Sequence, residues 1–296
     1  MCTLSQLCHG YVEGQNVVLE LRFGEGKAEE FPILAAELVR LKVDVILALT
    51  NPVIDAVRQA TQTIPIVMVG PNRGKRIFEP DYISRVMDES LRRLQTDYID
   101  LYQLHNPTVE VIERGAVWEV LERAKKAGKI RHYGVSINST EEGTAAVKDG
   151  RAETIQVEYN LLAQEPAETF FPAAQQANIG VIARVPLKRG ILTGKLKQSD
   201  EQRFQGEDVR ARSFKGEAFA QELAKAEQLK FLAHGPVQSL GQAAIAFCIA
   251  HPAVSVVIPG ARNAEQMREN ASAADVEIPA ADLDKISDLR RRNFAV

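Results

Sequence analysis

The segment Asp81–His105, DYISRVMDESLRRLQTDYIDLYQLH, gives the strongest indication of the fold. Its first half places apolar residues three and four positions apart, which is typical of an amphipathic helix packed on a core. Tyr98–Leu104 is a short apolar run rich in β-formers and predicts a strand. His105 ends that strand, and Asn106 and Pro107 begin a loop. Parallel α/β proteins bind ligands at the carboxyl ends of their strands, so His105 is a candidate functional residue.

The composition is that of a globular protein, with 296 residues, 45% apolar and 25% charged residues, and a net charge of −3. This near-neutral balance gives no electrostatic reason to expect a nucleic-acid partner. No apolar run approaches the ~18 residues that cross a bilayer, and MCTLSQLCHG lacks the features of a secretory signal. The cysteines are widely spread (Cys2, Cys8 and Cys248), which favours reduced thiols. We therefore expect a cytoplasmic protein without a membrane span or a metal site.

The first part of the chain reads as strand, helix, strand, helix, strand. Asn16–Phe23, Val43–Leu49 and Ile64–Val69 are the predicted strands, and Glu29–Leu41 is a predicted helix. Asn51 can cap the second helix, because Pro52 follows at its first position. Over residues 10–70 this segment, with GYVEGQNVVLELRFGEGKAEEFPILAAELVRLKVDVILAL and QATQTIPIVMVG, resembles the interior of a periplasmic substrate-binding protein of the ABC-transporter type. That resemblance implies a flavodoxin-like, doubly wound fragment.

From residue 77 to the C-terminus, strands and helices alternate again. The predicted strands include IRHYGVS, TIQVEYN, GVIARV and VSVVIPG. The predicted helices cover about 109–127, 166–177, 215–233, 239–250 and 280–291, and another helix starts with Thr140 as its N-cap. A long polar loop over residues 186–214 contains PLKRGILTGK. With DYIDLYQLH and GVS, these motifs resemble the aldo-keto reductase family.

Three strands from the first segment and five from the second give the eight that close a (β/α)8 TIM-type barrel. We therefore expect residues 1–296 to form one hybrid barrel domain, with strands 1–3 from the flavodoxin-like fragment and strands 4–8 from the reductase. The alternative is a three-stranded fragment beside an open five-stranded sheet, whose exposed edges would be unfavourable.

The family resemblance implies a catalytic tetrad of Asp, Tyr, Lys and His beside the substrate carbonyl. His105 matches the histidine of that tetrad. Thr50, Asn51 and Pro52 follow the second strand without the family's Asp and Tyr, and Met68 stands where the family has its lysine. Among the other tyrosines Tyr159 comes nearest to the site, and we expect it to be a packing residue. Efficient carbonyl reduction is therefore not expected.

The same resemblance implies a better preserved site for NADP(H). Ser136 and Gln156 match residues that hold the nicotinamide carboxamide; Ile137 takes the usual place of an asparagine, and Asn138 follows one position later. Arg184 occupies the place of a stacking aromatic. The pyrophosphate loop is represented by Pro186, Leu187, Gly190 and Leu192, and the adenosine end by Gly260, Arg262, Gln266 and Asn270, with Arg262 placed for a 2′-phosphate.

Three functions remain open at this point. The first is an aldo-keto reductase-like enzyme that acts on small carbonyls with weak turnover. The second is a non-catalytic dinucleotide-binding barrel, natural or engineered. The third function is a small-ligand binding module derived from the transporter-type segment. In each case we expect a monomer or a small homo-oligomer.

Overall fold

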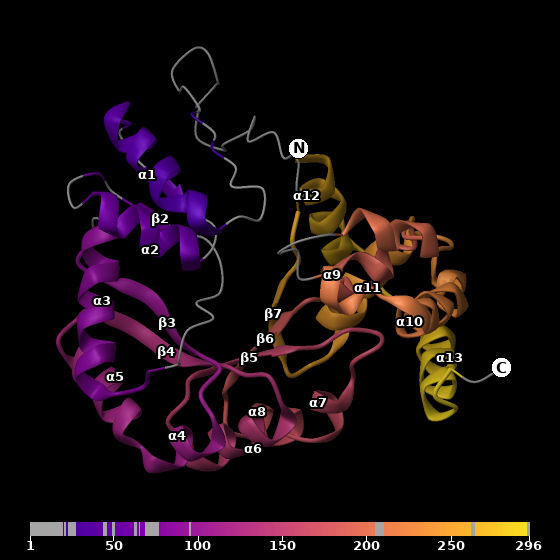
Figure 1. Cartoon of the computed structure of the whole chain (residues 1–296). Coiled ribbons are helices and arrows are strands. Elements are labelled where there is room, and N and C mark those ends of the chain that lie inside the picture. The colour runs from indigo at the N-terminus through magenta and orange to yellow at the C-terminus, as the bar shows by residue number, and fades with distance from the viewer. Residues whose placement is uncertain are drawn as a thin grey trace. The chain divides into compact units, whose positions relative to one another are not determined.

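The protein is described by a computed structural model over residues 20, 22, 28–43, 46–48, 51–61, 64, 66–68, 77–94, 96–204, 210–261 and 264–294. The chain divides into two compact units, Met1–Arg76 and Ile77–Val296. Each unit is described by itself below, and Figure 1 labels its helices and strands.

The first unit contains two helix–strand pairs. Helix α1 (Phe31–Arg40) follows a 3-10 turn, η1 (Ala28–Glu30), and helix α2 (Asn51–Ala60) separates the parallel strands β1 (Ile46–Ala48) and β2 (Ile66–Met68). Its small core is made by Ala35, Ile46, Ala56 and Val57. These elements fall within the predicted ones, whereas most of the predicted strand Asn16–Phe23 lies outside the described residues.

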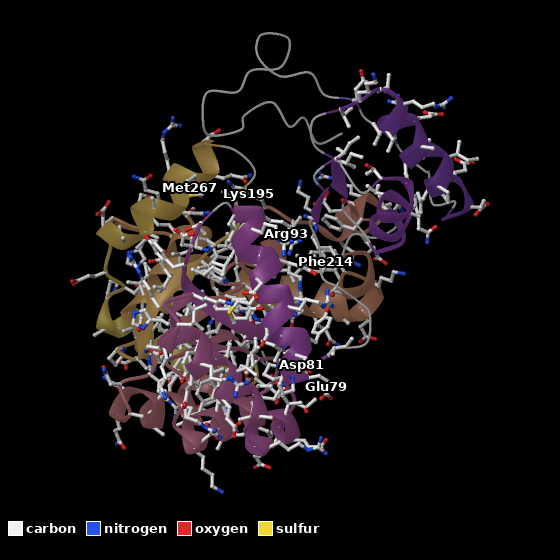
Figure 2. The ribbon with its side chains drawn as sticks, turned by 90° about the vertical axis from the view of Figure 1, so that its left-hand side faces the viewer. Glu79, Asp81, Arg93, Lys195, Phe214 and Met267 are labelled. Carbon is white, nitrogen blue, oxygen red and sulfur yellow. The ribbon has the colours of Figure 1, made fainter. Side chains whose placement is uncertain are left out.

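The second unit begins with the stretch that predicted the fold, and both of its parts are confirmed. Helix α3 (Pro80–Leu94) buries Ile83, Met87 and Leu91. It carries Asp81 in its first turn and Arg93 in its last, where each charge complements the helix dipole. Figure 2 shows these two residues towards opposite ends of the helix.

Five parallel strands follow in the order β3-β4-β5-β6-β7. They are β3 (Ile99–His105), β4 (Ile130–Ser136), β5 (Thr154–Glu158), β6 (Gly180–Arg184) and β7 (Val254–Ile258). The helices between them are α4 (Val109–Arg114), α5 (Ala116–Lys126), α6 (Thr140–Asp149), α7 (Glu165–Glu168), α8 (Phe171–Gln176), α9 (Arg210–Ser213), α10 (Gly216–Gln228) and α11 (Leu240–Ala250); α12 (Ala264–Ala271) and α13 (Ala280–Arg291) close the chain. The 3-10 turns are η2 (Lys188–Thr193), η3 (Gln198–Arg203), η4 (Lys230–Leu232) and η5 (Ser272–Asp275).

The two faces of the five-stranded sheet differ in chemistry. One face packs under the helices seen around it in Figure 1, and its side chains are at most 5% exposed: Leu104, Val135, Ile155, Val157, Val181 and Ala183. Side chains alternate along a strand, so the residues between these point to the other face. That second face, called the open face below, carries Gln103, His105, Ser136, Gln156, Glu158 and Arg184.

Four predictions about helices need correction. The helix expected over 215–233 ends at Gln228 and is followed by the 3-10 turn η4. The expected helix over 109–127 is two helices, because Gly115 adopts φ +81 between them. The expected helix over 166–177 is likewise divided into α7 and α8. The N-cap of α6 is Ser139, one residue before the predicted Thr140, because the Ser139 hydroxyl accepts the Glu142 N–H and the Glu142 carboxylate accepts the Ser139 N–H.

The described strands form a two-stranded and a five-stranded sheet, each within its own unit. The five-stranded sheet has the parallel α/β order of a TIM-type barrel. The eight-stranded ring over residues 1–296 stays a prediction. No helix among the described residues has both the length and the apolarity to span a bilayer.

Gly134 provides a test of the close contact between β4 and β5. A Cβ at this position would lie 2.1 Å from the Thr154 carbonyl oxygen. We expect Gly134→Ala to lower the free energy of unfolding by about 2 kcal/mol or more, measured by urea denaturation, because backbone would have to move. Gly180→Ala in β6 is the matched control, since its Cβ would meet its nearest neighbour at an ordinary 3.5 Å. Equal effects of the two substitutions would contradict this account.

Candidate functional site

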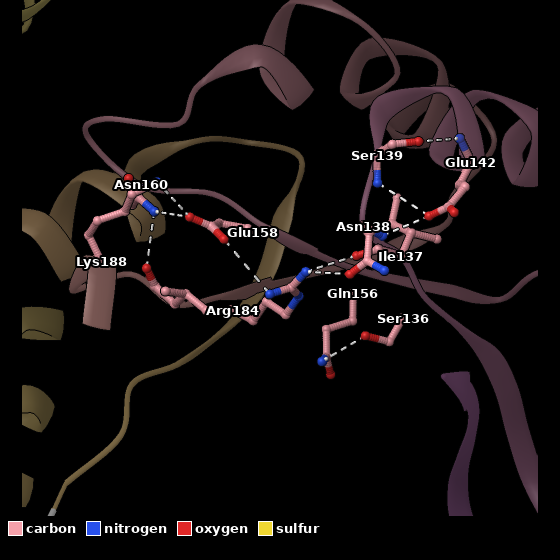
Figure 3. Close-up of polar contacts among 11 residues, drawn as sticks. Ser136, Ile137, Asn138, Ser139, Glu142, Gln156, Glu158, Asn160, Arg184 and Lys188 are labelled. Carbon is pink, nitrogen blue, oxygen red and sulfur yellow. Dashed lines mark hydrogen bonds and ion pairs between the residues drawn. The ribbon is translucent and has the colours of Figure 1, made fainter. Parts of the chain in front are cut away.

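The strand register brings three of the predicted site residues into one row on the open face of the sheet. His105 pairs with Ser136 across β3 and β4, and Ser136 pairs with Gln156 across β4 and β5. Gln156 Nε2 donates a 3.1 Å hydrogen bond to the Ser136 hydroxyl, as Figure 3 shows. Ser136 is buried, Gln156 is half-buried and His105 is exposed at the strand end. The row is therefore polar, and His105 is its exposed member at the edge where parallel sheets bind ligands.

The backbone after β4 is held by the cap of α6. The N–H of Asn138 donates to the Glu142 carboxylate at 2.7 Å, beside the Ser139 N–H at 3.2 Å. Ile137 is fully buried, whereas the side chain of Asn138 is exposed. At the position where the family usually has an asparagine, Ile137 therefore places an apolar side chain in the core. Asn138, one residue later, lies at the margin of the site.

Arg184 ends β6 and reaches across β5 to the end of β4. Its guanidinium donates to the Ile137 carbonyl at 3.0 Å and to Asn138 Oδ1 at 3.4 Å, and lies 3.9 Å from the Glu158 carboxylate (Figure 3). Burial lowers the pKa of Arg184, but a guanidinium keeps its charge at neutral pH. The predicted stacking position therefore holds a planar cation that is fixed by Glu158 on β5 and by the two residues that follow β4.

Glu158 is the acid at the centre of this group, and its Oε1 accepts from Lys188 Nζ at 3.0 Å. Burial opposes the charged carboxylate, but Lys188, Arg189 and Arg184 outweigh it and hold the pKa of Glu158 below its usual range. Glu158 and Lys188 were not among the predicted site residues. The spacing of Gln156 and Glu158, two positions apart on one strand, is the signal that would have placed Glu158 on the same face.

The predicted pyrophosphate loop follows β6 with an irregular backbone. Val185, Lys188 and Arg189 have φ values of +57, +45 and +55, and Gly190 has φ +108. Pro186 and Leu192 are buried, while Leu187 and Gly190 are half-buried. The loop is therefore anchored by apolar side chains, and its backbone turns repeatedly through the left-handed region.

The predicted adenosine end lies after β7. Asn270 is buried and its Nδ2 donates to the Gly260 carbonyl at 3.3 Å, and the Cβ position of Gly260 meets no atom within 4 Å. Gln266, one turn before Asn270 on α12, is exposed. Arg262 lies outside the described residues, so its predicted contact with a 2′-phosphate stays a prediction.

Tyr159 does not belong to the open face. It is 2% exposed, and its ring lies 5.1 Å from that of Phe171 and 5.6 Å from that of Phe247. Burial raises the pKa of its hydroxyl far above the usual value. Tyr159 is therefore a packing residue, as predicted, because odd spacing from Gln156 turns it towards the helices.

The Glu158 ion pairs predict a pH dependence of stability. A carboxylate whose pKa is lowered in the folded state stabilises the fold above its unfolded-state pKa, about 4.3, and loses that effect as the pH falls through the lower folded-state value. We expect Glu158→Gln to reduce the free energy of unfolding by about 1 kcal/mol at pH 7, with the difference from wild type shrinking below about pH 4.3, by urea denaturation. Glu119→Gln on the exposed side of α5 is the control. A difference that grows towards low pH would contradict the assignment.

A comparison with known sequences matches most of the chain to one family. The sequence model of the aldo/keto reductase family matches residues 47–291. The aldo-keto reductase YhdN of Bacillus subtilis is 35% identical over 202 residues, covering 66% of this chain and 60% of that protein. The aldo-keto reductase yakc [NADP(+)] of Schizosaccharomyces pombe is 31% identical over 214 residues, covering 70% of this chain and 62% of that protein. This chain thus spans about 60% of the length of these relatives.

A solved structure shows the same fold. The glycerol dehydrogenase AKR11B4 from Gluconobacter oxydans superposes with a TM-score of 0.63 at 24% identity, covering 92% of this chain and 88% of that one. The family match begins at residue 47, inside the segment over residues 10–70 for which we predicted a transporter-type origin, and nothing in these comparisons supports that origin. The sequence match from β1 to α13, together with the parallel α/β order of the sheet, shows that this chain belongs to the aldo/keto reductase family.

Proposed function

We propose that the chain binds NADP(H) as an aldo-keto reductase-like protein whose carbonyl reductase activity is weak or lost. The observation that carries the proposal is the row His105, Ser136 and Gln156 at the carboxyl ends of adjacent parallel strands. Members of this family typically bind NAD(P)H.

The polar groups of the row fit a nicotinamide carboxamide. A primary carboxamide has one oxygen acceptor and two N–H donors. The Ser136 hydroxyl accepts a hydrogen bond from Gln156 and can still donate its own proton to the carboxamide oxygen. The side-chain carbonyl of Gln156 can accept from the carboxamide N–H. The pair therefore offers both partners that the carboxamide needs, at the end of a sheet whose backbone is already fixed by its ladder.

The groups further along the chain fit the rest of a dinucleotide. Lys188 and Arg189 bring positive charge to the loop after β6, where a pyrophosphate would be attracted. Asn270 Nδ2 donates to the Gly260 carbonyl, and no atom lies within 4 Å of the position that a Cβ on Gly260 would take. A preference for NADP over NAD rests on Arg262 by resemblance, and the name of the Schizosaccharomyces pombe relative states NADP(+) for that protein.

The missing tetrad residues underlie the proposal of weak turnover. A bound reduced nicotinamide supplies hydride, but the alkoxide that forms also needs a proton from a nearby acid. His105 can orient a carbonyl from the strand end, whereas Tyr159 is buried on the other face of the sheet. Met68, in the place of the family's lysine, has no proton to give and no charge with which to tune a donor. A small carbonyl compound is thus the proposed substrate, with slow reduction or none.

The proposal includes a single barrel domain over residues 1–296. The family match that begins in β1 and the structural similarity over 92% of the chain support it. The hybrid origin of strands 1–3 from a flavodoxin-like fragment rests on resemblance alone, and the family match begins inside β1 and covers β2. A cytoplasmic location and a monomeric or small homo-oligomeric state stay predictions.

Two alternatives remain. A non-catalytic dinucleotide-binding barrel, natural or engineered, fits the same row without turnover. A small-ligand binding module is disfavoured, because it rests on the transporter-type resemblance alone.

Isothermal titration of the purified chain with NADPH tests this function. We expect saturable binding that Gln156→Ala weakens about tenfold, since the carboxamide loses a partner and Ser136 loses its own. Gln175→Ala, an exposed glutamine on α8, should leave the affinity unchanged. Absence of NADPH binding by the folded protein would refute the proposal.

NADPH oxidation with a small aldehyde then separates a weak enzyme from a binding protein.

A further inference from the structure

The backbone at the end of β6 is strained. Val185 follows the last strand residue, Arg184, with φ +57. A β-branched residue rarely adopts this conformation, and such a residue persists only where the surrounding structure holds it in place. Strained positions of this kind are concentrated at ligand-binding sites, and this one lies between Arg184 and the predicted pyrophosphate loop.

Asn160 is the side chain that holds the strained turn. It is fully buried, and its Nδ2 donates to the Val185 carbonyl at 3.1 Å and to Glu158 Oε1 at 3.4 Å. Its Oδ1 accepts the N–H of Leu162 at 2.9 Å. The backbone of Asn160 is fixed as well, because it exchanges two hydrogen bonds with Ala163. Figure 3 shows the carboxamide between Glu158 and the backbone beyond Arg184.

The turn held by Asn160 sets the start of the loop. The Val185 carbonyl accepts not only Asn160 Nδ2 but also the N–H of Lys188 at 3.0 Å. Lys188 in turn reaches back to Glu158, the carboxylate that Asn160 also contacts. A displacement of the Val185 carbonyl would therefore move the first turn of the loop and the Arg184 side chain before it.

The geometry points to Asn160 as a positioning residue for dinucleotide binding. Its carboxamide keeps Val185 left-handed, and thereby holds Arg184 and the loop Pro186–Gly190 where a dinucleotide would meet them. This inference rests on the proposed function and names a residue that the family resemblance did not assign. Asn160 touches neither the proposed nicotinamide pair nor any reacting atom, so its effect passes through Val185.

Asn160→Asp is the direct test. The substitution keeps the acceptor for Leu162 and removes both donated bonds, because a carboxylate has no N–H. We expect the Lys188 amide to exchange about tenfold faster in hydrogen-exchange measurements, since its acceptor is no longer held. We also expect NADPH to bind about tenfold more weakly by calorimetry. Asn160→Ala, which adds no charge, should change both quantities in the same direction, and it replaces Asn160→Asp if that variant does not fold.

The matched control is Asn178→Asp. Asn178 is exposed before the start of the same strand and also has a positive φ, so the chemical change is identical at the opposite end of β6. It should leave Lys188 exchange and NADPH affinity at their wild-type values.

Val185→Gly separates positioning from a general loss of packing. Glycine adopts positive φ without strain, so the turn no longer needs the Asn160 bond. In the Asn160→Asp background, Val185→Gly should bring Lys188 exchange and NADPH affinity back to within about threefold of wild type. A general packing defect at Asn160 would not respond to this change at Val185.

The outcomes distinguish this inference from the proposed function. Unchanged Lys188 exchange in both Asn160 variants, or failure of Val185→Gly to restore it, would overturn the positioning role. Wild-type protein that binds no NADPH would refute the proposed function, and also any role of Asn160 in dinucleotide binding, while the exchange data would still decide whether Asn160 holds the turn.

Discussion

The site depends on the register of the parallel strands β3, β4 and β5. The pairing of His105 with Ser136 and of Ser136 with Gln156 puts three polar side chains in one row. A slip of one residue in any strand would turn its member of the row into the helix-covered core and bring an apolar side chain to the open face. The burial of Leu104, Val135 and Ile155 therefore fixes the position of the polar row as strongly as any contact within it.

The close approach of β4 and β5 contributes to the same register. Gly134 leaves room for the Thr154 carbonyl, and Gln103 donates to the Thr154 hydroxyl at 3.2 Å from the neighbouring strand. These contacts lie on the open face, below the row. The open face of the sheet thus has hydrogen bonds near its middle and the polar row at the strand ends.

Next to the row, the ion pairs of Glu158 lie beside the strained backbone of Val185. Glu158 lies between Lys188 and Arg184, and Asn160 joins that carboxylate to the carbonyl of Val185. The half-buried carboxylate is paired with cations on the next strand and the loop after it, so the ion pairs also tie β5 to that loop. The left-handed conformation of Val185 is strained, so it depends on contacts such as the hydrogen bond from Asn160.

The alternation of strands and helices from residue 77 onward, the family resemblance and the strand-end position of His105 could all be predicted from the amino-acid sequence. These follow from local periodicity and from motifs that lie within a few residues of each other. Gly115 divided a predicted helix, and Ser139 replaced Thr140 as a cap, because such boundaries depend on single backbone conformations. The group formed by Glu158, Asn160, Arg184 and Lys188 could not be predicted in this way, since its contacts join residues up to 30 positions apart and depend on strand pairing.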